Sequence, residues 1–262
     1  MLSALLVKML ATAVVVIAVA VTVARLGPRL GGIVAGTPIV LGPGYFFMLR
    51  EQPAEFIATA AVSSLHALTA TVVFTISYVL LASRFGALAS MGLAALSWLP
   101  AALLFAGLPG GIPLALLAYG LVYLVARRVD RALRLPQPRV SAPTGWWNLL
   151  LRGVLAGGLV GLATTVAAGF GPVASGLLVG FPIGFITIGL TLHQRYGAPV
   201  ARATMAAAQA GLFSLVAFTA GIGLTAPLVT PMLSFILALL ASLSVSAGLF
   251  TASQLRARVP AA

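Results

Sequence analysis

The chain contains two related stretches that decide its fold, GPRLGGIVAGTPI at residues 27–39 and GPVASGLLVGFPI at residues 171–183. Both begin with Gly-Pro and end with the pattern G-x-x-x-G-x-P-I, and they lie 144 residues apart, the difference between positions 171 and 27. Proline kinks or ends a helix and glycine adopts backbone angles that other residues avoid. Each stretch therefore predicts a special backbone segment, and the chain has it twice.

The offset of 144 residues aligns more than these two stretches. Lys8 falls on Arg152, and Phe74-Thr75 falls on Phe218-Thr219. An ordered set of matches without gaps indicates an internal duplication. We therefore divide the chain into a first four-helix repeat at residues 1–107, a linker helix with a basic cytoplasmic loop at 108–144, and a second four-helix repeat at 145–262.

The composition excludes a soluble protein. Hydrophobic residues make up 61% of the chain, charged residues only 7%, and the mean hydropathy is +1.15. Soluble domains carry about a quarter charged residues, so this chain has too little polar surface to cover a core in water. The net charge of +12 does not indicate nucleic-acid binding, because the basic residues lie between apolar runs. Cysteine is absent, which excludes disulfides and thiolate metal sites.

Apolar runs of about 20 residues can cross a bilayer as helices. The predicted fold class is therefore all-α, a polytopic membrane protein with about nine transmembrane helices. These are expected near Leu2–Val23, Gly31–Leu49, Phe56–Ala82, Gly86–Ala106, Leu108–Ala126, Trp147–Gly169, Ala174–Leu192, Val200–Leu224 and Leu228–Leu255. The first run could instead be a signal peptide, but Lys8 lies inside it and a related segment recurs in mid-chain, so we expect a retained helix.

The distribution of arginine predicts the topology. With nine spans, one side of the membrane has a single loop arginine, Arg50. The other side has twelve, namely Arg25, Arg29, Arg84, Arg127, Arg128, Arg131, Arg134, Arg139, Arg195, Arg202, Arg256 and Arg258. Cytoplasmic loops are rich in Lys and Arg. We therefore expect the N-terminus outside and the C-terminus in the cytoplasm.

Five predicted spans separate equivalent points of the two repeats, so the second repeat is expected to be inverted. Inverted repeats recur in secondary transporters, which bind substrate near the bilayer midplane on broken helices where the repeats meet. The repeated stretches thus predict substrate contacts at Gly36, Thr37, Pro38, Gly180 and Pro182. The alternative is a motif for close helix packing and kinking, since small residues four apart let helices approach.

Four further polar side chains are candidates for substrate binding. Lys8 and Arg152 are predicted near opposite faces of the membrane, where a charge at depth is costly and often functional. Alternatively, their long stems carry the charge to the interface. His66 could carry a proton, or could be a neutral buried histidine bonded to a nearby hydroxyl. The second repeat has Ala210 at that position, with Gln209 beside it.

The remaining polar residues indicate the charge of the substrate. The three carboxylates, Glu51, Glu55 and Asp130, fall in predicted loops, so an anionic or neutral substrate is favoured over a cation. Thr75 and Thr219 match across the repeats and are expected to bond the backbone of the preceding turn. Since no cluster of metal ligands, phosphate loop or paired catalytic carboxylates is recognised, we expect no cofactor and no enzymatic activity.

The segment LLVK at residues 5–8, followed by RLGPRLGGIVAGTP at residues 25–38, resembles small bacterial inner-membrane proteins of the GlpM/YdgC type. Those proteins are single four-helix units, so the resemblance implies a fused double copy in the inner membrane. One member's link to exopolysaccharide production implies a possible role in the cell envelope. The second repeat matches more loosely, with Arg152 in place of lysine.

Together these observations predict a membrane transporter that works by alternating access, for an anionic or polar small solute or a lipid-linked substrate. The alternatives are a non-catalytic component of a cell-envelope or exopolysaccharide assembly system, or a passive channel or scramblase. The expected partners are the lipid bilayer and the small-molecule or lipid-linked substrate, with no nucleic acid.

Overall fold

The computed structural model describes residues 2–35, 38–135 and 145–258. Within these ranges every regular element is a helix. The α-helices are α1 (Leu2–Ala35), α2 (Leu41–Glu51), α3 (Ala54–Leu81), α4 (Ala87–Ala106), α5 (Gly111–Ala132), α6 (Trp146–Val179), α7 (Ile183–Ala208), α8 (Leu212–Thr225) and α9 (Pro231–Arg258), and a 3₁₀ turn at Gln209–Gly211 joins α7 to α8.

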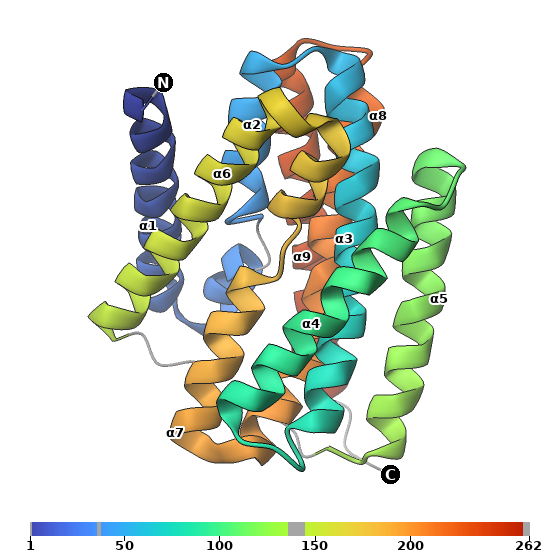
Figure 1. Cartoon of the computed structure of the whole chain (residues 1–262). Helices are drawn as coiled ribbons and strands as arrows, with labels where there is room; N and C mark the ends of the chain where they lie inside the picture. Colours follow the sequence, from blue (N-terminus) through green and yellow to red (C-terminus); the bar gives the residue numbers. More distant parts are fainter. Residues whose placement is uncertain (1, 36–37, 136–144, 259–262) are drawn as a thin grey trace.

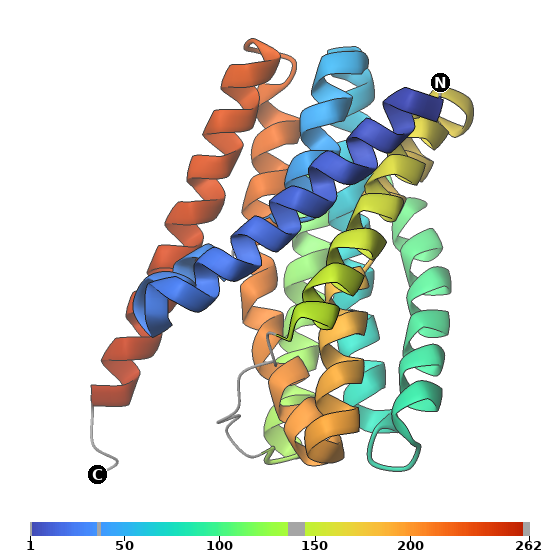
Figure 2. The same ribbon diagram turned by 90° about the vertical axis from the view of Figure 1, so that its left-hand side faces the viewer.

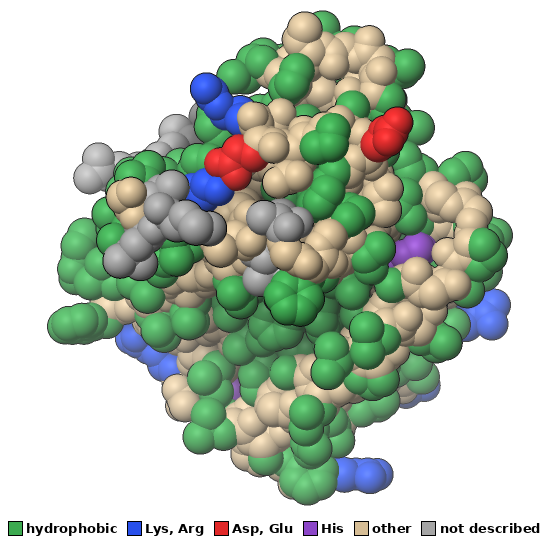
Figure 3. Space-filling model, turned by 45° about the horizontal axis from the view of Figure 1, so that its top comes forward, with side chains coloured by type: hydrophobic (Ala, Val, Ile, Leu, Met, Phe, Trp, Pro, Cys, Tyr) green, Lys and Arg blue, Asp and Glu red, His purple; other side chains and the backbone are tan. Residues whose placement is uncertain are grey.

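Several of these elements are long and apolar enough to cross a bilayer. Within the described residues six stretches qualify, at Ala54–Leu81, Ala87–Ala106, Gly111–Ala132, Trp146–Thr165, Gly169–Thr225 and Pro231–Leu255. Many large hydrophobic side chains are exposed on the outside of the bundle, and hydrophobic side chains occupy much of the face shown in Figure 3. These are the features of a multi-pass helical membrane protein, which confirms the predicted all-α membrane class.

Helix α3 is the centre of the bundle (Figure 1). Of its most apolar window 72% is buried inside the protein, against 17% for α5 and 22% for α9. Several of its hydroxyl side chains donate to its own backbone, as Thr75 does to the Val72 carbonyl. In α8, Thr219 donates in the same way to Leu215. Both threonines thus bond the preceding turn, as predicted.

Helices α1 and α6 cross in close contact (Figures 1 and 2). The contact is possible because α6 has glycine at every fourth position, Gly153, Gly157 and Gly161. A methyl group on Gly157 would overlap the carbonyl oxygen of Met9, and one on Gly153 would lie 3.3 Å from the carbonyl oxygen of Ala13. Such spacing of small residues brings helix backbones together in lipid, where no hydrophobic force drives helix association.

Two glycines reverse the chain inside α6 and α7. Gly171 has φ 81° and ψ −179°, and Gly197 has φ 82° and ψ 171°. Residues with a side chain rarely adopt these angles. Each glycine precedes a proline by one or two positions, and the ribbon turns back there at opposite ends of the bundle (Figure 1).

Several predicted boundaries are wrong. The helix predicted to end at Val23 continues as α1 through Gly27-Pro28 to Ala35. The loop predicted after Ala126 begins later, because α5 extends to Ala132 and includes Asp130. Glu51 ends α2 and Glu55 lies in the first turn of α3, so all three carboxylates are helical instead of in loops.

Candidate functional site: a cavity between two helix interruptions

The first interruption lies between α6 and α7. Helix α6 ends at Val179, and α7 begins at Ile183 after Pro182. The N–H groups of Gly180 and Phe181 close the last turn of α6 onto the carbonyls of Gly176 and Leu178, both at 3.1 Å. The predicted helix over Ala174–Leu192 is therefore two half-helices meeting at Gly180–Pro182.

The first turn of α7 leaves two backbone donors free. The Pro182 carbonyl accepts from Ile186 at 3.0 Å. The N–H groups of Gly184 and Phe185 have no backbone acceptor among the described residues. The start of a helix carries a partial positive charge of about half a unit from such groups. Here that charge lies at a partly buried position between two half-helices.

The second interruption lies between α1 and α2. Helix α1 ends at Ala35 and α2 begins at Leu41. Pro38 is buried, and its carbonyl accepts from the N–H of Gly42 at 2.6 Å. Gly36 and Thr37, two of the predicted substrate contacts, lie outside the described residues. The described residues 39–41, directly after Pro38, correspond to residues 183–185 at the offset of 144 residues.

Both interruptions line one cavity of about 520 Å³. Gly180 and Pro182, predicted as site residues, are on its wall, together with Ile39 and Val40 from the other interruption and Leu41 at the start of α2. The remaining described wall comes from six elements, through Leu68, Thr71, Val179, Phe181, Gly184, Phe185, Ile188, Thr204, Met205, Ala207, Ala208, Ala210, Gly211, Leu212, Leu215, Ser246, Leu249 and Phe250.

The described wall is apolar apart from three hydroxyl groups, and it has no charged side chain. Thr71 donates to the Ala67 carbonyl, and Thr204 donates to the Val200 carbonyl. Ser246 of α9 differs, because its hydroxyl is buried and has no partner within the described part of the chain. A buried polar group without a partner is unfavourable by about 1–3 kcal/mol.

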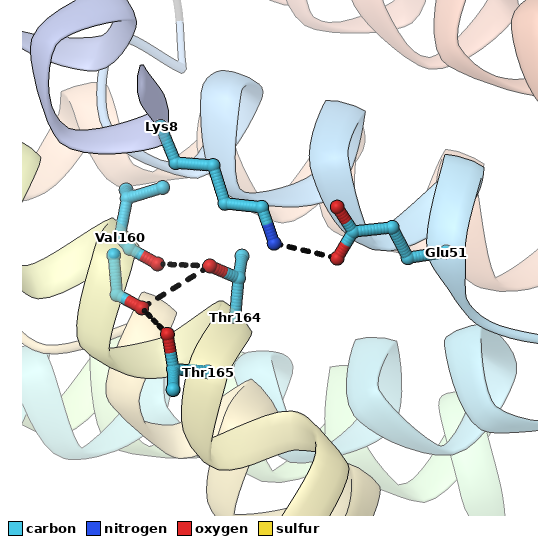
Figure 4. A network of polar contacts seen from close by, with 6 residues as sticks. Lys8, Glu51, Val160, Thr164 and Thr165 are labelled. Carbon is cyan, nitrogen blue, oxygen red and sulfur yellow. Dashed lines mark hydrogen bonds and ion pairs between the residues drawn. The ribbon is translucent and has the colours of Figure 1, made fainter. Parts of the chain in front are cut away.

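Lys8 is not on the described wall of this cavity. Its ammonium group donates to Glu51 Oε2 at 2.6 Å, beside Thr164 of α6 (Figure 4). It also lies 5.9 Å from the centre of the Phe47 ring. The Lys8 side chain is 13% exposed and that of Glu51 is 42% exposed. The ion pair thus joins α1 to the end of α2.

Exchanging the charges of this ion pair tests whether Lys8 holds α1 to α2 or binds substrate. We expect Lys8→Glu alone to reduce the amount of folded protein, because two carboxylates would then face each other. The double variant Lys8→Glu, Glu51→Lys should recover it, since a partly exposed pair contributes about 1 kcal/mol or less and depends little on its direction. The measurement is the yield of monodisperse protein together with its thermal unfolding midpoint. A double variant no better than Lys8→Glu would contradict the joining role.

Arg152 also lies away from the described cavity wall, near the start of α6. Its Nε and Nη2 atoms are buried and have no hydrogen-bond partner within the described ranges. Unlike Lys8, it therefore has no carboxylate partner there. The two basic residues that the repeat aligns thus have different surroundings.

His66 and Gln209 are buried at separate places. His66 lines a second cavity of about 420 Å³ with Thr59 and Ser63. Neither ring nitrogen of His66 has a partner among the described residues, because Ser63 donates to the Thr59 carbonyl instead. The alternative interpretation of His66, a histidine bonded to a nearby hydroxyl, therefore has no such bond among the described residues. Gln209 is fully buried in the 3₁₀ turn, and its amide also lacks a described partner.

The sequence contained a signal for Ser246 that our predictions did not use. Ser242 and Ser246 lie one turn apart in α9, and both hydroxyls are buried without a partner in the described chain. Two serines on one face of an apolar helix point to an interior polar surface. The free N–H groups of Gly184 and Phe185 could be predicted from the break at Pro182, because the first N–H groups of a new helix have no acceptor in a preceding turn.

Comparisons of the chain with protein-family models, with curated proteins and with solved structures gave no match. The site therefore rests on its geometry. Two helix interruptions far apart in the sequence face one cavity, whose described wall has no charged side chain and includes the free N–H groups of Gly184 and Phe185.

Proposed function

We propose that the protein is a membrane transporter in which two inverted four-helix repeats carry a substrate by alternating access. The observation that supports this most is the cavity, because interruptions at equivalent positions of both repeats reach it. Broken helices at the interface of inverted repeats hold the substrate in known transporter folds. The proposed substrate site therefore comprises Gly180 and Pro182, their repeat equivalents Gly36 and Pro38, and Thr37 between the latter two.

The crossing of α1 and α6 supports the inverted relation. The offset of 144 residues exchanges Met9 with Gly153 and Ala13 with Gly157. A two-fold axis that exchanges the repeats would therefore convert the contact between Gly157 and Met9 into a contact between Ala13 and Gly153. The structure contains both contacts. Reciprocal contacts of this kind are the signature of a two-fold axis. With antiparallel helices, such an axis lies across the bundle and inverts one repeat.

The proposed topology has nine spans, an outside N-terminus and a cytoplasmic C-terminus, in a bacterial inner membrane. The two termini lie at opposite ends of the bundle, as an odd number of spans requires (Figures 1 and 2). The excess of arginine on the side assigned to the C-terminus, in loops and in the helix segments predicted as loops, supports the orientation.

A hollow interior favours transport over the alternatives. An assembly component of the cell envelope, as the resemblance to GlpM/YdgC proteins implies, needs a surface for partners but no interior cavity. A passive channel or scramblase needs a polar path, whereas the described wall has only three hydroxyl groups. Lys8 and Arg152 remain proposed contacts near the two mouths, and His66 and Gln209 remain proposed interior polar contacts.

Because the chain has no cysteine, a single introduced thiol can report access to the cavity. We expect Ser246→Cys to react with a membrane-impermeant maleimide added from either side of sealed vesicles, since alternating access opens the cavity to each side in turn. Proteoliposomes of the same variant should hold an ion gradient. Ser253→Cys, exposed farther along α9, is the matched control and should react from one side only.

Two outcomes would reject the transporter. Reaction of Ser246→Cys from one side only would indicate a fixed cavity, as in an assembly component. Reaction from both sides with collapse of the ion gradient would indicate a channel.

A further inference from the structure

The last part of α6, residues 172–179, lies on a buried face of α3. This α3 face consists of small residues at helical spacing, namely Ala60, Ser63, Ser64 and Ala67. A Cβ atom on Gly176 would overlap the Ala60 carbonyl, and one on Gly180 would lie 2.5 Å from Ala67 Cβ. Ser64 also donates to the Gly176 carbonyl at 2.7 Å. The residues of the α3 face are at most 4% exposed, so the end of α6 closes this face.

The second repeat has the equivalent face, and there it is open. The part of α7 after Gly197 continues through the 3₁₀ turn into α8 and corresponds to α3 at the offset of 144 residues. The equivalents of the α3 face are Thr204, Ala207, Ala208 and Gly211. Ala207 and Gly211 are exposed, and the other two are partly exposed. All of them are on the wall of the cavity, so this open face borders the proposed substrate site.

The duplication identifies the segment that fits the open face. At the offset of 144 residues, Gly32 corresponds to Gly176 and Ala35 to Val179. A two-fold axis that exchanges the repeats converts every contact of the end of α6 with the α3 face into a contact of the end of α1 with the open face. Residues 29–35 of α1 are therefore the counterpart of the α6 segment.

A single backbone bend distinguishes the two repeats here. Helix α6 turns at Gly171, which has φ 81°, whereas α1 is helical through Gly27 and Pro28. Gly27 can adopt the same backbone angles, and proline is tolerated in the first turn of the half-helix that would follow. The helix below the open face also changes to a 3₁₀ turn at Gln209–Gly211, and such a change within a helix is typical of a hinge.

We propose that the end of α1, residues 29–35, docks on the open face when α1 bends at Gly27, and that this docking closes the cavity on the side of the open face. The proposal rests on the proposed function, in that the repeats are taken as inverted copies, and it names the movement that controls access to the site. In this structure α6 is bent and docked while α1 is straight. The opposite state has α1 bent and docked, with α6 released from the α3 face.

An engineered disulfide can detect the docked end of α1. A Cβ atom on Gly44 would lie 3.7 Å from Val179 Cβ, within the roughly 3.5–4.5 Å that a disulfide needs. The offset exchanges this pair with Ile188 and Ala35. We therefore expect the double variant Ala35→Cys, Ile188→Cys to crosslink in proteoliposomes on oxidation with copper phenanthroline. The reference variant Gly44→Cys, Val179→Cys should crosslink as well, and mass spectrometry of peptides measures both bonds.

A third substitution tests whether the crosslink depends on the open face. Adding Gly211→Leu to Ala35→Cys, Ile188→Cys should lower the crosslinked fraction at least about tenfold, because leucine fills the space that the helix end needs. Gly92→Leu is the matched control, since Gly92 is also an exposed glycine with open space around it but lies on α4, and it should leave the crosslink unchanged. A crosslink in the reference variant alone, or one that Gly211→Leu does not reduce, would overturn the proposal.

The two proposals fail in different ways. If Ala35→Cys, Ile188→Cys does not crosslink but Ser246→Cys is reached from both sides without ion leakage, the docking of α1 is wrong and transport stands. If the crosslink forms and Gly211→Leu reduces it, but Ser246→Cys is reached from one side only, the docking stands and the transport proposal is wrong.

Discussion

Gly157→Leu is expected to destabilise the protein by about 3 kcal/mol or more, at the upper end of the effect of overfilling a packed interface. A side chain at this position would overlap the carbonyl oxygen of Met9, which belongs to the backbone of α1 and cannot rotate away. The two helices would have to separate along the crossing that holds α1 to the bundle. We expect little monodisperse protein, and a large fall in the thermal unfolding midpoint of what remains.

The neighbouring Gly158→Leu is the control for this experiment. A Cβ atom at Gly158 meets only the flexible end of the Met9 side chain, at 4.0 Å. Leucine also has a much higher helix propensity than glycine, so Gly158→Leu should be neutral or slightly stabilising. Equal losses for both variants would mean that added bulk anywhere on this part of α6 disrupts folding, and that the close contact is not the cause.

Gly176→Ala is expected to destabilise the protein by about 2 kcal/mol or more, although the added group is a single methyl. That methyl would overlap the Ala60 carbonyl and approach Ser63 Cβ on α3. It would also displace a chain of hydrogen bonds in which Tyr45 donates to Ser64 at 2.7 Å, and Ser64 donates to the Gly176 carbonyl at 2.7 Å. This chain ties α2, α3 and α6 together beside the interruption at Gly180.

Gly169→Ala in the same helix provides the comparison, because a Cβ atom there meets nothing within 4 Å. Alanine should stabilise this position by up to about 1 kcal/mol through helix propensity alone. Unfolding of both variants can be followed by circular dichroism during titration of a mild detergent with dodecyl sulfate. A Gly176→Ala variant as stable as Gly169→Ala would show that α3 and α6 can separate here without loss of stability.

The helices predicted best from the sequence are those with helix-breaking residues, proline or glycine, at their ends. The predicted helices Phe56–Ala82 and Gly86–Ala106 correspond closely to α3 and α4, which are bounded by Pro53 and Gly86. The Gly-Pro pairs were less informative. Gly171 leaves the helical region, whereas α1 is helical through Gly27 and Pro28. Proline tolerates the first turn of a helix, so the dipeptide alone does not decide whether the chain bends.

Charged residues were poor guides to where helices end. The loop was predicted to begin after Ala126 because Arg127 and Arg128 follow, yet α5 continues to Ala132. Arginine has a good helix propensity, and its long side chain can reach the interface from a helix end. A run of arginine therefore indicates where a helix leaves the membrane, and the helix itself can extend farther.

The part of the site that the backbone forms could be predicted from the sequence. Gly180 and Pro182 follow from the repeated motif, since a break in a helix is encoded by local residue types. Ser246 was not predictable in the same way, because a helical serine usually bonds its own preceding turn, as Ser253 does to the Phe250 carbonyl. The partner of Lys8 depends on how α1 packs on α2, which no local pattern encodes.

The crossing of α1 and α6 also sets an order of events during synthesis. Met9 meets its partner only when Gly157 has been translated and inserted, which at about 5–20 residues per second takes on the order of ten seconds. Through that interval α1 lacks its main neighbour, while α2, α3, α4 and α5 are synthesised. The ion pair of Lys8 with Glu51 becomes available much sooner and can keep the first helix close to the growing bundle until its glycine-rich partner arrives.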